Sequence, residues 1–210
     1  MKEGDNMIYV FATFTKTGNL KYISHLDLHR AMTRLLLRSG LPIRFSEGFN
    51  PHPKLTFAQP LSIFQESLCE VAEFRLDEGA DCPNEASALE KLRAVEPEVM
   101  HFLQVVYSER KLPVCKAARY ELTFRTSMEP EAFASLFDGE MPVLKKTKTK
   151  EKTLDIAPLI GEKQFSAIDG GVKLRCVLPC GNDYLNPSYV EAFLGERISE
   201  MQVLRTELLF

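Results

Sequence analysis

The distribution of apolar and polar residues predicts three strands in the first half of the chain. Residues 68–76 (LCEVAEFRL) alternate between apolar and polar positions, which is the period of a strand with one buried face. Residues 7–16 (MIYVFATFTK) also alternate and are rich in aromatic and β-branched side chains, which favour strands. A further strand is predicted over residues 99–107. Together these segments supply a sheet for the first half.

Two helices are predicted between these strands. Ser24 is a suitable N-cap, and Asp27 stands three residues later in the capping-box position. Gly40 and Pro42 end this helix, because glycine favours a C-cap and proline cannot continue the helix. The second helix is predicted over residues 81–94. On the first helix, the face predicted for the core comprises Leu28, Met32, Leu35 and Leu36. The opposite face of that helix carries Arg30, Arg34 and Arg38.

The order of these elements indicates a fold class. It becomes β-α-β-β-α-β if a short strand lies at residues 43–45 or 54–57, which is the order of the ferredoxin-like fold. The same order recurs in the second half, so the sequence predicts an α+β protein with two tandem ferredoxin-like (βαββαβ) domains. The expected division is a first domain over 1–107, a linker over 108–116 and a second domain over 117–210. The second-half elements are strands over 118–125, 143–149, 171–178 and 203–210 and helices over 129–138 and 187–194.

The segment that follows the first helix suits neither regular element. Residues 41–61 contain four prolines, one glycine and three phenylalanines. Pro51 and Pro53 fix φ and remove two backbone donors, and they restrict Asn50 and His52 to extended geometry. We therefore predict a stiff loop that presents polar side chains for binding. A purely structural crossover is the alternative interpretation.

Composition places the chain among ordinary globular proteins, with 45% hydrophobic and 26% charged residues. It contains no apolar run of the roughly 18 residues that a membrane span requires, and no membrane partner is expected. The N-terminus is polar and lacks an apolar signal core. Five cysteines, an odd number without a repeating framework, fit a reducing compartment. These features predict a cytoplasmic protein.

Positive charge is concentrated although the net charge is −3. Residues 16–61 hold seven Lys or Arg against two Asp or Glu, together with three of the four histidines, which predicts a nucleic-acid-binding surface. Residues 145–152 form a second basic run of five lysines and one glutamate, although lysines also protect exposed edge strands from mispairing. The predicted binding residues are Lys16, His25, Arg30, Arg44, Phe49, Asn50, His52, Lys54, Lys146, Lys148 and Lys150.

Two long motifs carry a resemblance to a known family. They are residues 18–30 (GNLKYISHLDLHR) and 41–54 (LPIRFSEGFNPHPK), and the runs at 145–152 and 205–208 (RTEL) also fit. With these motifs the chain resembles the radical SAM-linked proteins, a family without an assigned function, over nearly its whole length. The resemblance implies a radical SAM enzyme as partner, fused or encoded nearby, and proximity to RNA-processing and ribosomal functions. It implies no reaction.

The chain itself is not expected to carry the iron–sulfur cluster of such an enzyme. That cluster needs three cysteines spaced C-x3-C-x2-C, whereas this sequence offers Cys176 and Cys180 with no third cysteine nearby. We therefore predict no cofactor and no metal in this chain. Radical chemistry, where it occurs, would belong to the partner.

The expected function is an RNA-binding or substrate-presenting accessory module for a radical SAM enzyme in tRNA or rRNA modification, without activity of its own. The alternative is a metal-independent endoribonuclease resembling the CRISPR repeat-processing enzymes, with His25, His29 or His52 as general base. A metal site of these histidines and Asp27 is a weaker interpretation. On a helical wheel Asp27 points about 160° away from the pair formed by His25 and His29.

Overall fold

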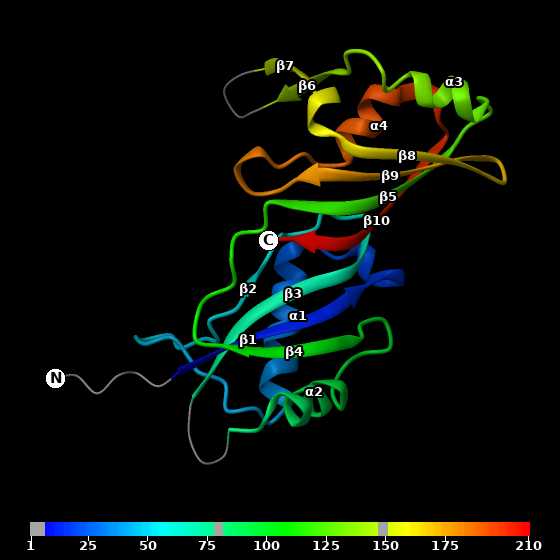
Figure 1. Ribbon diagram of the computed structural model, residues 1–210. Helices are drawn as coiled ribbons and strands as arrows, with labels where there is room; N and C mark the ends of the chain where they lie inside the picture. The colour runs from blue at the N-terminus through cyan, green and yellow to red at the C-terminus, as the bar shows by residue number, and fades with distance from the viewer. Residues whose placement is uncertain (1–6, 78–81, 147–150) are drawn as a thin grey trace. The chain divides into compact units, whose positions relative to one another are not determined.

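The computed structural model describes residues 7–77, 82–146 and 151–210. The chain divides into two compact units, Met1–Val114 and Cys115–Phe210, which we call the N-terminal and C-terminal units. Each unit combines helices with an antiparallel sheet, so the protein is of the mixed α+β class (Figure 1).

The N-terminal unit is built on four strands in the spatial order β4-β1-β3-β2. The central pairs β1–β3 and β1–β4 are antiparallel, as is the short pair β2–β3. The elements are β1 (Met7–Lys16), η1 (Gly18–Tyr22), α1 (His25–Arg38), β2 (Thr56–Phe57), β3 (Gln65–Asp77), α2 (Glu85–Arg93) and β4 (Phe102–Ser108).

Helix α1 begins where the sequence predicts. The Oγ of Ser24 accepts a hydrogen bond from the backbone N–H of Asp27 at 3.1 Å, and the Asp27 carboxylate accepts the Ser24 hydroxyl at 2.7 Å. The cap satisfies the backbone N–H of Asp27, a donor that the first turn would otherwise leave unpaired, and the Ser24–Asp27 side-chain bond holds the cap in place. The predicted core face is confirmed, since its members Leu28, Met32, Leu35 and Leu36 are all buried.

The side chains of β1 alternate between the two faces of the N-terminal sheet. Its buried residues include Val10 and Phe14, which belong to the core cluster beneath α1. The intervening positions face away from that core, and there Tyr9 pairs with Arg75 and Phe11 pairs with Glu73 across β3. The face away from the helices thus carries polar and aromatic side chains together.

The short strand predicted beside β3 is observed in reduced form. Strand β2 contains only Thr56 and Phe57, paired with Glu73 and Ala72. The other predicted position contributes one isolated bridge, between Ile43 and Leu76. The chain from Arg44 to Leu55 therefore runs outside the regular sheet and is available to shape a site.

The C-terminal unit repeats the spatial arrangement with strands in the order β10-β5-β9-β8. Its pairs β10–β5, β5–β9 and β8–β9 are antiparallel. The elements are β5 (Ala117–Arg125), α3 (Pro130–Ser135), β6 (Pro142–Lys146), β7 (Glu151–Asp155), η2 (Ala157–Leu159), β8 (Gly161–Ile168), β9 (Gly171–Pro179), η3 (Gly181–Asp183), α4 (Ser188–Leu194), η4 (Gly195–Arg197) and β10 (Glu200–Leu209).

The strand predicted over 143–149 is only partly correct. Strand β6 ends at Lys146 and pairs with β7 in a separate two-stranded sheet, while residues 147–150 lie outside the described residues. The place beside β9 belongs instead to β8, which the sequence analysis does not predict. Most side chains of β8 are exposed, so it lacks the apolar alternation that reveals a strand.

Two local features shape the C-terminal sheet. Gly171 opens β9 so close to β5 that an added Cβ would overlap the carbonyl oxygen of Phe124. In β8 the register shifts between Gly161 and Gln164, and Glu162 has a positive φ of 49°. These values indicate a β-bulge at the start of the outer strand.

Candidate functional site

The proline-rich segment after α1 closes into a compact loop. The backbone N–H of Ser46 donates to the carbonyl of His52 at 2.8 Å, and the His52 N–H donates to the Ser46 Oγ at 3.1 Å. Between them Gly48 has a φ of 117°, which side chains rarely adopt. An isolated bridge between Phe45 and Pro53 completes the closure. Both the N–H and the carbonyl group of His52 are therefore fixed by hydrogen bonds to Ser46.

The imidazole of His52 is held in one orientation. Its Nδ1 lies 3.1 Å from the carbonyl oxygen of Asn50 and 3.1 Å from the Oγ of Ser46. Since a carbonyl oxygen only accepts, we assign the proton of the neutral ring to Nδ1. The Nε2 then carries the lone pair, and the side chain is exposed.

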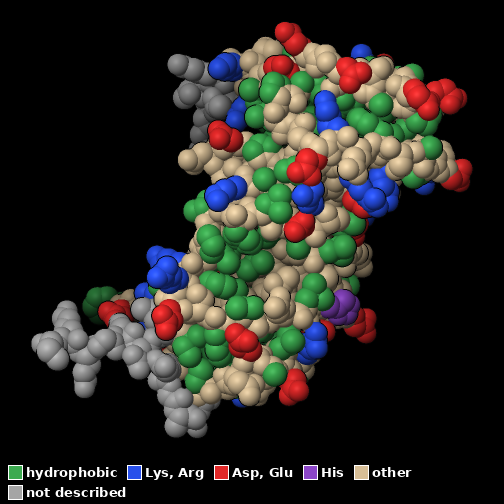
Figure 2. Space-filling view, viewed as in Figure 1, with side chains coloured by type: hydrophobic (Ala, Val, Ile, Leu, Met, Phe, Trp, Pro, Cys, Tyr) green, Lys and Arg blue, Asp and Glu red, His purple; other side chains and the backbone are tan. Residues whose placement is uncertain are grey.

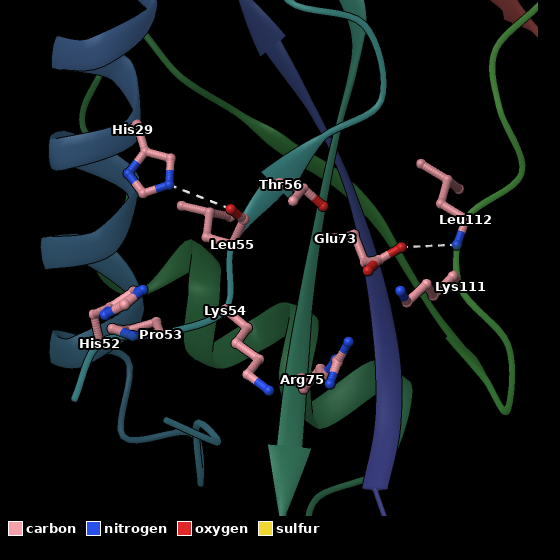
Figure 3. A pocket seen from close by; sticks show the side chains of 10 residues that line it. All are labelled: His29, His52, Pro53, Lys54, Leu55, Thr56, Glu73, Arg75, Lys111 and Leu112. Atoms are coloured by element: carbon pink, nitrogen blue, oxygen red, sulfur yellow. Dashed lines mark hydrogen bonds between the residues drawn. The ribbon is translucent and has the colours of Figure 1, made fainter. Parts of the chain in front are cut away.

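A cavity of about 530 Å³ lies beside this loop and is bordered by α1, β2, β3 and the segment after β4 (Figure 3). It is open to solvent on one side, and polar and apolar groups contribute to its walls. Its lining residues are His29, His52, Pro53, Lys54, Leu55, Thr56, Glu73, Arg75, Lys111 and Leu112.

The cavity is predominantly cationic. Lys54 and Lys111 are exposed at its border, and Arg75 reaches it from β3. Glu73 is the single carboxylate among the described lining residues, and it accepts a hydrogen bond from the backbone N–H of Leu112 at 2.7 Å. This bond holds the segment after β4 against the sheet, which places Lys111 at the cavity.

A small cluster of rings continues from the cavity along the N-terminal end of α1. The Nε2 of His29 lies 3.2 Å from the carbonyl oxygen of Leu55 and therefore donates to it. The ring of Phe57 lies edge-on to both histidines, with centroids 6.2 Å from His29 and 5.5 Å from His25. Phe57 thus links the two histidines of the helix to strand β2.

The structure brings some of the predicted binding residues together. His52 and Lys54 line the cavity, and Asn50 positions His52 through its carbonyl oxygen. Phe49 lies fully exposed at the tip of the same loop. His25 contacts Phe57 at the edge of this region.

Other predicted residues lie elsewhere. The prediction of Lys16 as a binding residue is wrong, because its side chain is buried and its Nζ donates to the carbonyl oxygen of Gln65 at 3.3 Å. Arg30 is exposed and pairs with Asp27 at 3.1 Å, and the Arg44 guanidinium lies 3.7 Å from the carboxylate of Asp77. Lys146 ends β6, but its side chain is outside the described part of the structure, as are Lys148 and Lys150 entirely.

Three charged residues that line the cavity were not among the predicted binding residues. Glu73 and Arg75 are polar positions of a strand whose alternation predicts only that they face away from the core. Lys111 belongs to the segment read as a linker. The signal that could have found Glu73 and Arg75 is the pairing of β3 with β2 and with the proline-rich segment after α1, which a single sequence does not provide.

The arrangement of the potential metal ligands and the state of the cysteines can also be described. Across residues 7–77, 82–146 and 151–210, no three His, Cys, Asp or Glu side chains gather closely enough to hold a metal ion. All five cysteines are thiols rather than disulfides. Burial raises the pKa of the Cys176 thiol to about 12, so this cysteine is a poor ligand at neutral pH.

Residues 10–187 match the family described as uncharacterized proteins conserved in bacteria (DUF2344). The chain belongs to this family. The description names no reaction and no radical SAM enzyme, so that link stays a prediction. No curated protein matches the chain. In the described residues no helix is long and apolar enough to cross a membrane.

Among 21 matching chains of solved structures is one from the "Crystal Structure of a Cbf5-Nop10-Gar1 Complex". It is 11% identical to this chain, with a TM-score of 0.47, and the match covers 95% of this chain and 48% of that chain. This chain therefore spans about half the length of that neighbour. A likeness of this size carries no conclusion about function.

Proposed function

We propose that this protein is an RNA-binding accessory module that presents its substrate to a radical SAM enzyme. The observation that carries the RNA-binding part is the cavity of the N-terminal unit. Lys54, Arg75 and Lys111 border it together with two histidines, against Glu73 as the single carboxylate among the lining residues that the structure describes. An excess of cations around an open cavity favours a polyanionic ligand.

The stiffness of the loop supports the same proposal. His52 is fixed by Ser46 and Asn50 before any ligand arrives, so little conformational entropy is lost when a phosphate or base contacts it. The cavity of about 530 Å³ also falls within the range of small-molecule and cofactor sites, so it has room for one nucleotide of a strand.

The distribution of surface charge favours RNA binding at one local site over binding across the whole surface. On the face shown in Figure 2, lysine and arginine side chains lie interspersed with acidic ones, in keeping with the net charge of −3. Binding is therefore expected to concentrate where cations outnumber carboxylates, as they do at the cavity. A surface on which both signs alternate attracts a polyanion less than the cavity does, which restricts how the RNA can lie on the protein.

We further propose that both units are ferredoxin-like domains. In each, the first and third sheet strands are central and the fourth lies beside the first, giving β4-β1-β3-β2 and β10-β5-β9-β8. The β6–β7 hairpin is then an insertion in the second domain. Sheets of this kind bind single-stranded RNA through one open face.

The proposed radical SAM partner rests on the resemblance of the motifs at 18–30 and 41–54. In this arrangement the partner supplies the cluster and the radical, and this chain supplies RNA. The partner is tested by copurification of the tagged chain from its native host. A specifically retained protein that carries C-x3-C-x2-C and binds S-adenosylmethionine supports it, and repeated recovery of no such protein contradicts it.

RNA binding is tested by fluorescence anisotropy with a labelled single-stranded RNA of mixed sequence. Replacing both Lys54 and Lys111 by Ala should weaken binding and lower the slope of log affinity against log salt by roughly 1.4, since each lost phosphate contact removes about 0.7. A control with Arg34→Ala and Lys116→Ala removes two exposed cations that do not line this cavity. Equal losses in both variants, or binding that is insensitive to salt, would count against the proposal.

One observation favours the nuclease as a second candidate. With its Nδ1 proton donated to Asn50, the exposed His52 has a basic Nε2 available to accept a proton from a 2′-hydroxyl. Pure protein incubated with RNA in EDTA separates the two functions. Cleavage at a defined position that disappears in His52→Ala assigns catalysis to this chain. RNA that stays intact supports the accessory role instead.

A further inference from the structure

Two large aromatic side chains are exposed next to each other on the N-terminal unit, and we call them the aromatic pair. They are Tyr22 in η1, which is 56% exposed, and Phe64 immediately before β3, which is 71% exposed. Their ring centroids are 6.0 Å apart at an interplanar angle of 76°. Each ring therefore keeps much of its surface open to solvent although the two support each other.

The backbone holds Phe64 in this position at a cost. Its φ is 69°, in the left-handed region that a bulky L-residue rarely occupies. A hydrogen bond from its N–H to the carbonyl oxygen of Lys21 at 2.7 Å fixes this conformation against η1. Burial of the side chain does not offset the free-energy cost of this conformation, because the ring remains exposed. Strain that persists without burial is typical of residues kept for a contact with another molecule.

The aromatic pair is close in the chain to the candidate site. Tyr22 stands three residues before His25, whose ring contacts Phe57 at 5.5 Å. Phe57 in turn contacts His29, which lines the cavity. A series of ring contacts thus leads from the cavity to His25 at the start of α1, three residues after Tyr22.

A cation accompanies the aromatic pair. The Nζ of Lys21 lies 5.4 Å from the centroid of the Tyr22 ring. Exposed aromatic faces beside a cation are the combination with which proteins hold single-stranded nucleic acids, because bases stack on the rings and the phosphates meet the positive charge. A purely apolar protein contact would not require this cation.

We propose that Tyr22 and Phe64 form a stacking site for bases of a single-stranded RNA whose backbone occupies the cavity. The inference rests on the proposed function and extends it, because it assigns the bases, and not only the phosphates, a binding site. Stacking of this kind tolerates every base, since each has a π face. The cavity contributes charge, and the aromatic pair contributes affinity that is independent of charge.

The test compares two probes of equal length: a labelled single-stranded RNA and an oligomer with the same backbone but abasic at every position. Anisotropy titrations are made with the parent, Tyr22→Leu, Phe64→Leu and Phe64→Gly. Phe64→Gly removes the ring and also the strain, so its unfolding temperature should not fall. Phe210→Leu, at an exposed aromatic in the other unit, is the matched control.

Loss of either ring should weaken binding of the base-containing RNA by roughly fivefold or more. The salt slope should stay unchanged, and Phe210→Leu should bind as the parent does. The abasic oligomer should bind the parent more weakly and should not distinguish the variants. These results together support the inference.

Different results overturn it in distinguishable ways. If both probes bind the parent equally, or if the Tyr22 and Phe64 variants bind RNA normally while the Lys54/Lys111 double variant does not, the proposed function survives and the stacking site is refuted. If neither probe binds the parent, the proposed function and the inference fail together.

Discussion

Arg75 lies with its guanidinium carbon 4.7 Å from the ring centroid of Tyr9, its direct cross-strand partner in β1. The contact connects the cavity, which Arg75 lines, to the face of the sheet that carries Tyr9. Tyr9 therefore restricts where the positive charge of Arg75 can be placed. A ligand in the cavity meets an arginine whose orientation is already set.

This contact should be measurable as a coupling energy. In a double-mutant cycle of Tyr9→Leu and Arg75→Met, chemical unfolding should return a favourable coupling of about 0.5–1 kcal/mol, the usual range for an exposed cation–π pair. Arg75→Lys should retain part of it, because the charge stays while the planar stacking is lost. Strictly additive effects would show that the two side chains do not interact in solution.

The tautomers of two histidines are predicted from their partners. At a pH where both rings are neutral, His52 should carry its proton on Nδ1 and His29 on Nε2, because each of these atoms faces a carbonyl oxygen. Long-range ¹H–¹⁵N spectra distinguish the two forms, and His52→Asn and His29→Asn assign the signals. An Nε2-protonated His52 would remove the geometric basis for its role as a base.

A glycine pair tests the packing of the C-terminal sheet. Gly171→Ala should lower the unfolding temperature markedly, because its Cβ would overlap the backbone carbonyl of Phe124 and force β5 and β9 apart. Gly139→Ala is the control, since a Cβ there meets open space and φ is not positive. It should be neutral or stabilising by up to about 1 kcal/mol. Equal stability of the two variants would place Gly171 away from β5.

Stability should rise with pH in a way that depends on Cys115. A hydrogen bond from the Cys180 thiol, aided by the charge of Arg205, lowers the pKa of the Cys115 thiol from 9.0 to about 7. The folded state therefore releases its proton more readily than the unfolded state. The stabilisation is fully present above about pH 9 and is lost as pH falls through 7.

Urea unfolding of the parent and of Cys115→Ala between these pH values checks this. The parent should gain free energy of unfolding with rising pH relative to the variant, with Cys176→Ala as the control at a buried thiol. Parallel pH profiles in the parent and Cys115→Ala would show that the thiol is not perturbed.

The sequence predicted those elements whose signals are local. The Ser24 cap and the apolar spacing after it define α1, and alternation defines β1 and β3. Strand β8 escaped because its exposed side chains follow no apolar period, so only pairing with β9 reveals it. Strand β6 was visible, but its partner β7 was not, since a lysine-rich hairpin resembles a solvated loop.

Some residues of the candidate site could likewise be predicted from local sequence, whereas others depend on the folded chain. His52 could be singled out because neighbouring prolines dictate a rigid loop whatever the rest of the chain does. Arg75 and Lys111 reach the cavity only through the register of β3 and the hydrogen bond that the Leu112 N–H donates to Glu73, which are properties of the folded chain. Lys16 was misplaced because charge in a sequence window does not reveal which side of a strand is buried.

The bulge in β8 has a consequence for behaviour at high concentration. A straight, apolar strand at the border of a sheet recruits further strands and promotes aggregation. Here Glu162 breaks the register, its carboxylate is engaged by Arg119, and the neighbouring Lys163 and Gln164 are exposed. A second strand would meet charges and an irregular row of donors. The border formed by β8 thus resists intermolecular β-sheet growth.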